Sequence, residues 1–79
     1  MSKQILYFSC GFKAGRGASL KADIPKPAKN TSDAIRSAER MATLRVGSAA
    51  YSVEGDAESG DFDEPVVLFR AGRVPPEFE

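Results

Sequence analysis

One segment, residues 31–47 with the sequence TSDAIRSAERMATLRVG, constrains the fold of this chain more than any other. Its apolar residues recur with the 3.6-residue period of an α-helix. Asn30 and the two residues after it each offer an oxygen that caps a first turn, and Gly47 offers the left-handed residue that ends a helix. The sequence therefore predicts an amphipathic helix over about residues 31–46. Its inner stripe is mostly alanine, which lets a helix lie close to a flat sheet: Ala34, Ile35, Ala38, Met41, Ala42 and Val46.

Short apolar stretches bounded by glycine or proline predict four β-strands outside this helix, over residues 4–12, 19–24, 48–54 and 65–72. The first and the last are the most apolar, so we expect them at the centre of a sheet and the other two at its edges. The order along the chain is ββαββ, and the order across the sheet is second, first, last, third. The predicted fold class is α+β, a four-stranded, mostly antiparallel sheet with the one helix packed on one face.

A chain of 79 residues forms a single small domain, because it buries only about 60–65% of its unfolded surface in one core. We expect this domain to span residues 1–74, and residues 75–79, which begin with two prolines, to form a flexible tail. The single cysteine is typical of a reducing compartment. No run approaches the about 20 apolar residues of a membrane-spanning helix. The sequence therefore predicts a soluble, cytoplasmic protein that has no membrane partner.

Charge is distributed unevenly along the chain, although the formal net charge is zero. Residues 1–30 hold six basic residues and one acidic residue, a net charge of +5. Residues 31–79 hold five basic and ten acidic residues, a net charge of −5. Either the two sets neighbour and neutralise each other in the fold, or the molecule is dipolar and attracts a charged partner, or its own copy, through one side.

The inventory of reactive side chains argues against an enzyme. Histidine, the commonest general base and neutral metal ligand, is absent from the sequence. Cys10 lies between Phe8 and Phe12 in a predicted strand, so we interpret it as a small buried hydrophobe. The glycine-rich residues 11–17 lack both the ending and the following helix of a phosphate loop, and they predict a hairpin turn. We therefore assign no catalytic residue and no cofactor.

An acidic segment, residues 54–64, holds six carboxylates and no basic residue. Carboxylate oxygens suit calcium or magnesium, but the glycine and the final acid do not stand where an EF-hand needs them. A solvated loop is the simpler interpretation. We assign no metal site, and adventitious binding of a cation stays open.

A set of short motifs runs through the C-terminal half of the chain: AIRxAERMA at 34–42, AYS at 50–52, Gly-Asp pairs at 55–56 and 60–61, DEP at 63–65 and GxVP at 72–75. Across residues 34–76 this combination resembles a group of short, stand-alone, uncharacterised bacterial proteins, and the N-terminal hairpin matches more loosely. The resemblance implies a bacterial protein carrying a domain of unknown function. It implies no catalytic residue.

A surplus of apolar strand surface is the best indication of function. One helix covers one face of a sheet, so alternate residues of the two predicted central strands must face away from it. We expect Ile5, Tyr7, Val67 and Phe69 to form an exposed interface for a protein partner or for a second copy in a homodimer. The predicted function is a small cytoplasmic interaction or accessory module.

The alternative is a nucleic-acid-binding module that uses the basic N-terminal hairpin. Lys13, Arg16 and Lys21 would then be its anion contacts. The isoelectric point of the whole chain, about 6.3, lacks the basic excess that is typical of such proteins. The interaction module is therefore the favoured prediction.

Overall fold

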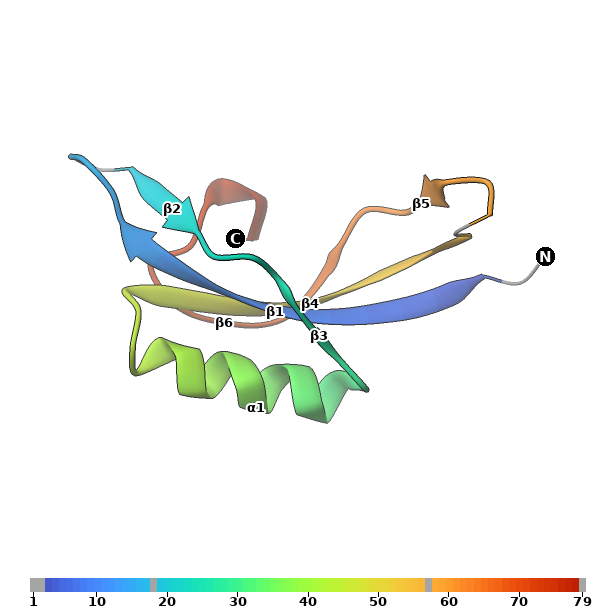
Figure 1. Cartoon of the computed structure of the whole chain (residues 1–79), viewed down its shortest axis with the longest axis horizontal. Coiled ribbons are helices and arrows are strands. Elements are labelled where there is room, and N and C mark those ends of the chain that lie inside the picture. The colour runs from blue at the N-terminus through green and yellow to red at the C-terminus, as the bar shows by residue number, and fades with distance from the viewer. Residues whose placement is uncertain (1–2, 18, 57, 79) are drawn as a thin grey trace.

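The computed structural model describes residues 3–17, 19–56 and 58–78, and it shows a two-layer α+β domain (Figure 1). The helix α1 (Thr31–Ala42) lies under one face of a curled antiparallel sheet, and a short 3-10 helix, η1 (Pro76–Phe78), lies on the other face. The predicted α+β class, with one helix packed on an antiparallel sheet, is confirmed. The described residues form six strands: β1 (Gln4–Ala14), β2 (Leu20–Ala22), β3 (Lys26–Ala28), β4 (Gly47–Asp56), β5 (Asp61–Phe62) and β6 (Val66–Gly72).

Two long antiparallel strands, β1 and β4, form the centre of the sheet. Gln4 lies opposite Gly55 at one end of the pair, and Phe12 lies opposite Gly47 at the other. The short strands β2 and β3 both pair with the outer edge of β1, and β5 and β6 both pair with the outer edge of β4. The sheet therefore has four positions filled by six strands, so the predicted count of four strands and the simple ββαββ order are wrong in detail.

Local sequence explains why each edge is divided into two strands. Pro25 follows β2 and cannot donate to a ladder, so the edge stops there and resumes as β3. On the other edge, the segment predicted as an acidic loop turns at Gly60, whose φ is 77°, and returns beside β4 as β5. Ala57, within that predicted loop, lies outside the described residues.

The predicted strand order is wrong for the last two long strands. The sequence predicts residues 65–72 at the centre and residues 48–54 at an edge, whereas the structure places β4 beside β1 and β6 outside β4. The reason is close packing. Ala49 and Ala50 are fully buried, because small side chains let other elements approach both faces of β4.

A β-bulge accounts for the apolar run in β6 that suggested a central strand. The register shifts between Ala50, which pairs with Phe69, and Tyr51, which pairs with Val67. Leu68 is therefore an extra residue, and both Leu68 and Phe69 pack against the cluster under α1. The bulge therefore explains why consecutive residues of β6 are apolar although β6 lies at the edge of the sheet.

Helix α1 begins where the sequence predicts and ends earlier. Asn30 is the N-cap, and its side-chain oxygen accepts a hydrogen bond of 2.8 Å from the backbone N–H of Asp33. Thr43 is the C-cap, and its hydroxyl donates to a carbonyl of the preceding turn at 2.7 Å. The predicted end at residue 46 is therefore wrong, and Gly47 is the first residue of β4 instead of a helix cap.

Buried side chains form one small cluster on each face of the sheet. The cluster under α1 consists of alanines, with larger side chains packed around it: Ala34, Ala38 and Ala50, then Tyr7, Ala28, Ile35, Leu68 and Phe69. The cluster on the opposite face is more aromatic: Cys10, Phe12 and Ala49, then Tyr51, Val74 and Phe78. Two thin layers of core therefore share the small side chains of β4.

The C-terminal residues cover the second cluster where the sequence predicts a flexible tail. The centroid of the Phe78 ring lies 5.6 Å from that of Phe12 and 5.2 Å from that of Tyr51. Gly47 permits the crossing, because a Cβ on it would collide with the backbone that passes over it. Within the segment predicted as a tail, the structure therefore describes a 3-10 helix over Pro76–Phe78 that packs on the sheet, and Glu79 lies outside the described residues.

Candidate functional site

The helix covers only half of the central strand pair, and the cause is the length of the elements. α1 has 12 residues, which span about 18 Å at 1.5 Å per residue. β1 has 11 residues, which span about 36 Å at 3.3 Å per residue. Figure 1 accordingly shows the β1–β4 pair running well beyond α1, and η1 lies over the same half on the opposite face.

The two halves of the β1–β4 pair differ in exposure. Residues 9–12 and their partners, residues 47–50, are all buried, and we call them the covered half. Residues 4–6, at the other end of β1, are all exposed. We call the apolar residues at this uncovered end the arm: Ile5, Leu6, Val53, Phe62 and Val66.

The arm presents apolar side chains on both faces of the sheet. Ile5 alternates with Tyr7 and so points to the α1 face, but it is 51% exposed. Leu6 points to the opposite face and is 37% exposed. Phe62 is 47% exposed and lies over Gly55, where a Cβ would collide with its ring. The arm is therefore a two-sided apolar projection with no layer packed on it among the described residues.

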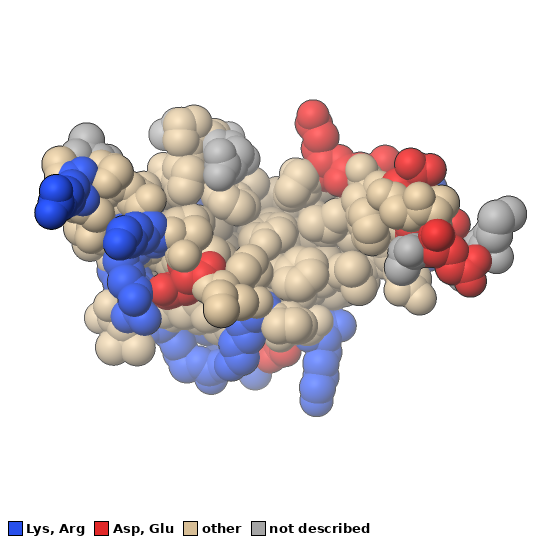
Figure 2. Space-filling model, turned by 45° about the horizontal axis from the view of Figure 1, so that its top comes forward, with Lys and Arg blue, Asp and Glu red and all other residues tan. Residues whose placement is uncertain are grey.

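Acidic side chains surround the arm. Figure 2 shows them as the red end of the molecule, at the right. The connecting loop is held by Asp56, whose side chain accepts the backbone N–H of Glu58 at 2.9 Å. Lys3 lies 3.7 Å from Asp63, and both of these side chains are exposed to solvent. We call the six carboxylates at this end the acidic cluster: Glu54, Asp56, Glu58, Asp61, Asp63 and Glu64.

The geometry of the acidic cluster does not form a metal centre. Among the residues that the structure describes, no group of three or more His, Cys, Asp or Glu side chains is placed to hold a metal ion. The cluster instead gives the end that carries the arm a negative field.

The predicted anion contacts lie together at the opposite end of the molecule, which is blue in Figure 2. Lys13 and Lys21 are directly opposite each other in the β1–β2 register, and Arg16 lies in the turn that joins these strands. Asp23 accepts a 2.8 Å hydrogen bond from Arg45 Nε, and its carboxylate lies 3.7 Å from Lys13 Nζ. One carboxylate therefore neutralises part of this charge.

Apolar side chains are exposed at this end as well. Leu44 is 76% exposed and Val46 is 40% exposed. Together with Lys13 and Arg45 they line a hollow of about 410 Å³. We call this surface the basic end: Lys13, Arg16, Lys21, Leu44, Arg45 and Val46.

The four predicted interface residues do not share a face. Tyr7 and Phe69 pack against the cluster under α1, so they belong to the core. Val67 pairs with Tyr51 and points to the other face. Only Ile5 belongs to the arm. The sequence predicts that the odd-numbered residues of β1 face away from the helix, whereas in the structure they face it. An error of one residue in a strand moves every side chain to the wrong face.

Sequence reasoning missed Leu6, Phe62 and Val66 as exposed residues of the arm. The alternation that predicts Ile5 and Tyr7 on the face away from the helix turns Leu6 toward it, and Phe62 lies in the segment interpreted as a solvated loop. One signal was present in the sequence. A helix of this length is shorter than the first strand, so part of that strand must extend beyond it.

The thiol of Cys10 is held as a neutral buried group. Its Sγ donates to the backbone carbonyl of Asp23 at 3.2 Å. Burial, and then the negative charge of Asp23, raises the pKa of the Cys10 thiol above its ordinary value of 9.0. A thiol that stays protonated at neutral pH is a poor nucleophile. The interpretation of Cys10 as a small buried hydrophobe is confirmed.

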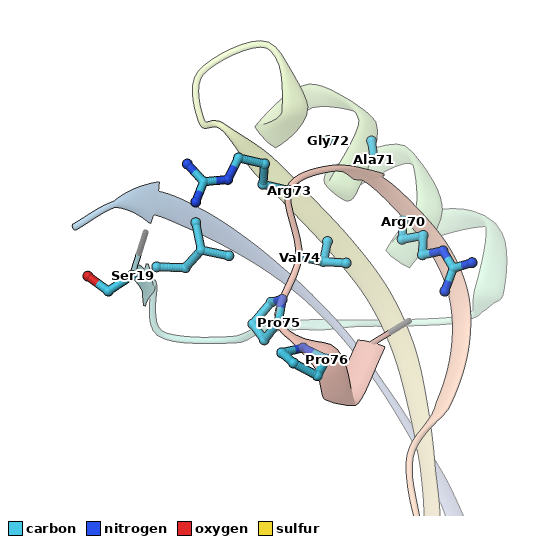
Figure 3. Close-up of a pocket in the computed structure, with 9 residues that line it drawn as sticks. Ser19, Arg70, Ala71, Gly72, Arg73, Val74, Pro75 and Pro76 are labelled. Atoms are coloured by element: carbon cyan, nitrogen blue, oxygen red, sulfur yellow. The ribbon is translucent and has the colours of Figure 1, made fainter. Parts of the chain in front are cut away.

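A larger hollow, of about 840 Å³, lies between the start of β2 and the segment that leads to η1 (Figure 3). Ser19 lines one side, and residues 70–76 line the other. Figure 3 shows the guanidinium groups of Arg70 and Arg73 on opposite sides of this segment, and Arg70 donates to the Phe78 carbonyl at 3.0 Å. Because the two cations diverge, we assign no ligand site to this hollow.

Comparisons of the chain with protein-family models, with curated proteins and with solved structures find no match. The resemblance to short bacterial proteins therefore stays a prediction. Within the part of the chain that the structure describes, no helix has the length and apolar character needed to cross a membrane.

Proposed function

We propose that this protein is a small interaction module that binds a protein partner through the arm. One observation carries the proposal: large apolar side chains are exposed on both faces of the same projecting strand pair. Contiguous exposed apolar residues with a polar rim mark binding surfaces more often than single exposed residues do. The function is binding without catalysis, in keeping with the absence of histidine and the neutral Cys10 thiol.

The chemistry of the arm specifies the kind of partner. Phe62, about half exposed in the arm, has the aromatic character of an anchor residue. The acidic cluster around it attracts cations and repels anions. Such charges set the rate and specificity of encounter more than the final affinity. The matching partner is an apolar segment with basic residues beside it.

A peptide of alternating leucine and lysine with one tryptophan tests this surface directly. The chain has no tryptophan of its own, so the emission of the peptide reports on its environment alone. We expect a blue shift and saturable binding to the wild-type protein, and no binding of the same peptide with glutamate in place of lysine. Absence of lysine-peptide binding would contradict the proposal.

Two matched substitutions locate the binding site. Ile5→Glu places a charge in the arm, and Ile24→Glu makes the same change at an apolar residue outside the arm that is 91% exposed. Ile5→Glu should weaken binding by about tenfold, the effect of losing about 1.4 kcal/mol of contact energy, whereas Ile24→Glu should leave it unchanged. Since the new glutamate favours a basic peptide electrostatically, a loss identifies an apolar contact. Equal binding by both variants would contradict the assignment.

The alternative function, nucleic-acid binding at the basic end, is supported by the pairing of Lys13 with Lys21 beside Arg16. Three cations neutralise few phosphates, so this binding would be weak at physiological salt. A fluorescent single-stranded oligonucleotide separates the two functions. Binding that is lost in Lys21→Glu and kept in Ile5→Glu would replace our proposal with the alternative.

A further inference from the structure

We propose that the partner is a second copy of this chain, and that copies join head to tail, with the arm of one against the basic end of the next. This inference rests on the proposed function, because it names the partner that the arm binds. Two surfaces of one molecule carry it. Each combines exposed apolar side chains with a charge of one sign, and the two signs are opposite.

The two surfaces are too far apart to satisfy each other within one chain. The molecule is 44 Å long. β1 connects the surfaces, with Ile5 in the arm and Lys13 at the basic end, a rise of about 26 Å at 3.3 Å per residue. In Figure 2, Lys and Arg side chains gather at the left and along the lower edge, whereas most Asp and Glu side chains gather at the right. A second copy brings the two surfaces into contact without any change of fold.

The apolar parts of the two surfaces are complementary in form. The arm projects, with Phe62 near its end, whereas the basic end is hollowed beside Leu44 and Val46. This hollow is shallow and is lined by charged as well as apolar side chains, so a projecting aromatic side chain can lie against its apolar part at the centre of an interface. The contact would therefore cover the most exposed large side chains of both ends at once.

The charged parts are complementary as well. Lys13 and Arg45 share one carboxylate, that of Asp23, so this pair keeps an excess of positive charge. The acidic cluster, in turn, has more carboxylates than cations beside it, with Lys3 paired to Asp63. Pairing across the contact would steer the two ends together, with a strong dependence on salt.

Head-to-tail contact is favoured over a two-fold contact between two arms. An interface with two-fold symmetry uses the same surface on both copies. Two arms would bring two acidic clusters together, and like charges in an interface are costly. A heterologous contact leaves one free arm and one free basic end on every assembly. Copies therefore continue to add with rising concentration unless a ring closes.

The mass of the particle across a concentration series tests the inference. We expect light scattering or sedimentation to show a weight-average mass that rises past twice the 8.5 kDa of one chain. The rise should diminish when salt is raised from about 0.15 M to about 1 M, where the Debye length falls from about 8 Å to 3 Å. A mass that stays at that of one chain at every concentration would overturn the head-to-tail contact, whereas a mass that stops at that of two would mean that two such contacts close a ring of two copies.

A mixing experiment with two blocked variants identifies the surfaces. Ile5→Glu blocks the arm, and Leu44→Glu blocks the basic end. Each variant alone should stay at the mass of one chain, with association at least about tenfold weaker than wild type. Mixed together, they should form a 1:1 complex that grows no further, because only one intact arm and one intact basic end remain. Absence of a complex in the mixture would overturn the inference, and its formation also shows that both variants are folded.

The two proposals fail in different ways. If the lysine peptide binds the arm but the wild-type protein keeps the mass of one chain at every concentration, the inference is wrong and the interaction module stands. If neither the peptide nor a second copy binds, both proposals are wrong.

Discussion

The covered half and the arm lie at the two ends of the same strand pair, β1 and β4, yet the exposure of many of their side chains is the reverse of what hydrophobicity suggests. The covered half contains small residues such as Ser48, Ala49 and Ala50, which are fully buried. The arm contains Ile5 and Leu6, which are exposed. Burial here follows from which strand residues α1 and η1 reach more than from side-chain hydrophobicity. The large apolar residues that neither α1 nor η1 covers have no role in the core. The arm is therefore the best candidate for a binding surface.

The strongest test of this comparison removes one phenyl ring from each half. Phe12 is 1% exposed in the covered half, and Phe62 is about half exposed in the arm. Phe12→Ala should lower the free energy of unfolding by about 3–5 kcal/mol, which is most of the stability of so small a domain. Phe62→Ala should cost less than about 1 kcal/mol. Urea unfolding followed by circular dichroism measures both, and equal losses would show that the arm is part of the core.

The closeness of α1 to the covered half is the next feature to test. Ala38 is fully buried between the helix and the sheet, and Ala22 is exposed in the edge strand β2. Ala38→Leu should overpack this contact and cost about 1–3 kcal/mol, whereas Ala22→Leu should change the stability by no more than about 0.5 kcal/mol. Thermal unfolding compares the two. An unchanged melting temperature for Ala38→Leu would mean that the helix does not dock through its alanine face.

Two buried serines of the covered half differ in their hydrogen bonding. The Ser48 hydroxyl donates to the Ala38 carbonyl at 2.6 Å, whereas the buried Ser9 Oγ has no hydrogen-bond partner among the described residues. Ser48→Ala should therefore destabilise the fold by about 1 kcal/mol, and Ser9→Ala should be neutral or slightly stabilising. Chemical unfolding of both variants checks the difference. A destabilised Ser9→Ala would show that this hydroxyl makes a contact that matters for stability.

The smallest expected effect is a decline in stability at alkaline pH. Burial raises the pKa of the Cys10 thiol in the folded state, so the unfolded chain loses this proton first, at about the ordinary value of 9.0. The folded state then binds more protons than the unfolded state, and the free energy of unfolding falls as pH rises above 9.0. Burial also raises the pKa of Tyr51, which adds a second decline above its ordinary value of 10.0.

The variant Cys10→Ala separates these two declines. It should remove the first and leave a smaller second decline, because the charge of Cys10 adds to the effect of burial in raising the pKa of Tyr51. Urea unfolding across the alkaline range measures both. A first decline that persists without the thiol would assign it to another group.

Local features of this protein could be read from the sequence. The alanine stripe, the cap at Asn30, the glycine-rich hairpin turn and the burial of Cys10 all follow from residues close together in the chain. Periodicity, capping and turn chemistry act over a few residues, so one sequence is enough to predict them. The uneven distribution of charge along the chain could also be read from the sequence, but the sequence did not show which ends of the sheet would carry the basic and the acidic residues.

The tertiary structure alone decided which face of β1 meets α1, which strand lies beside β1, and where the cover ends. Strand alternation specifies two faces without saying which one a distant helix will reach. The return of residues 73–78 over the second face depends on a glycine in β4, far away in sequence. The arm exists because a helix rises less than half as far per residue as a strand, so the part of β1 that α1 leaves uncovered is set by how the two elements are placed against each other.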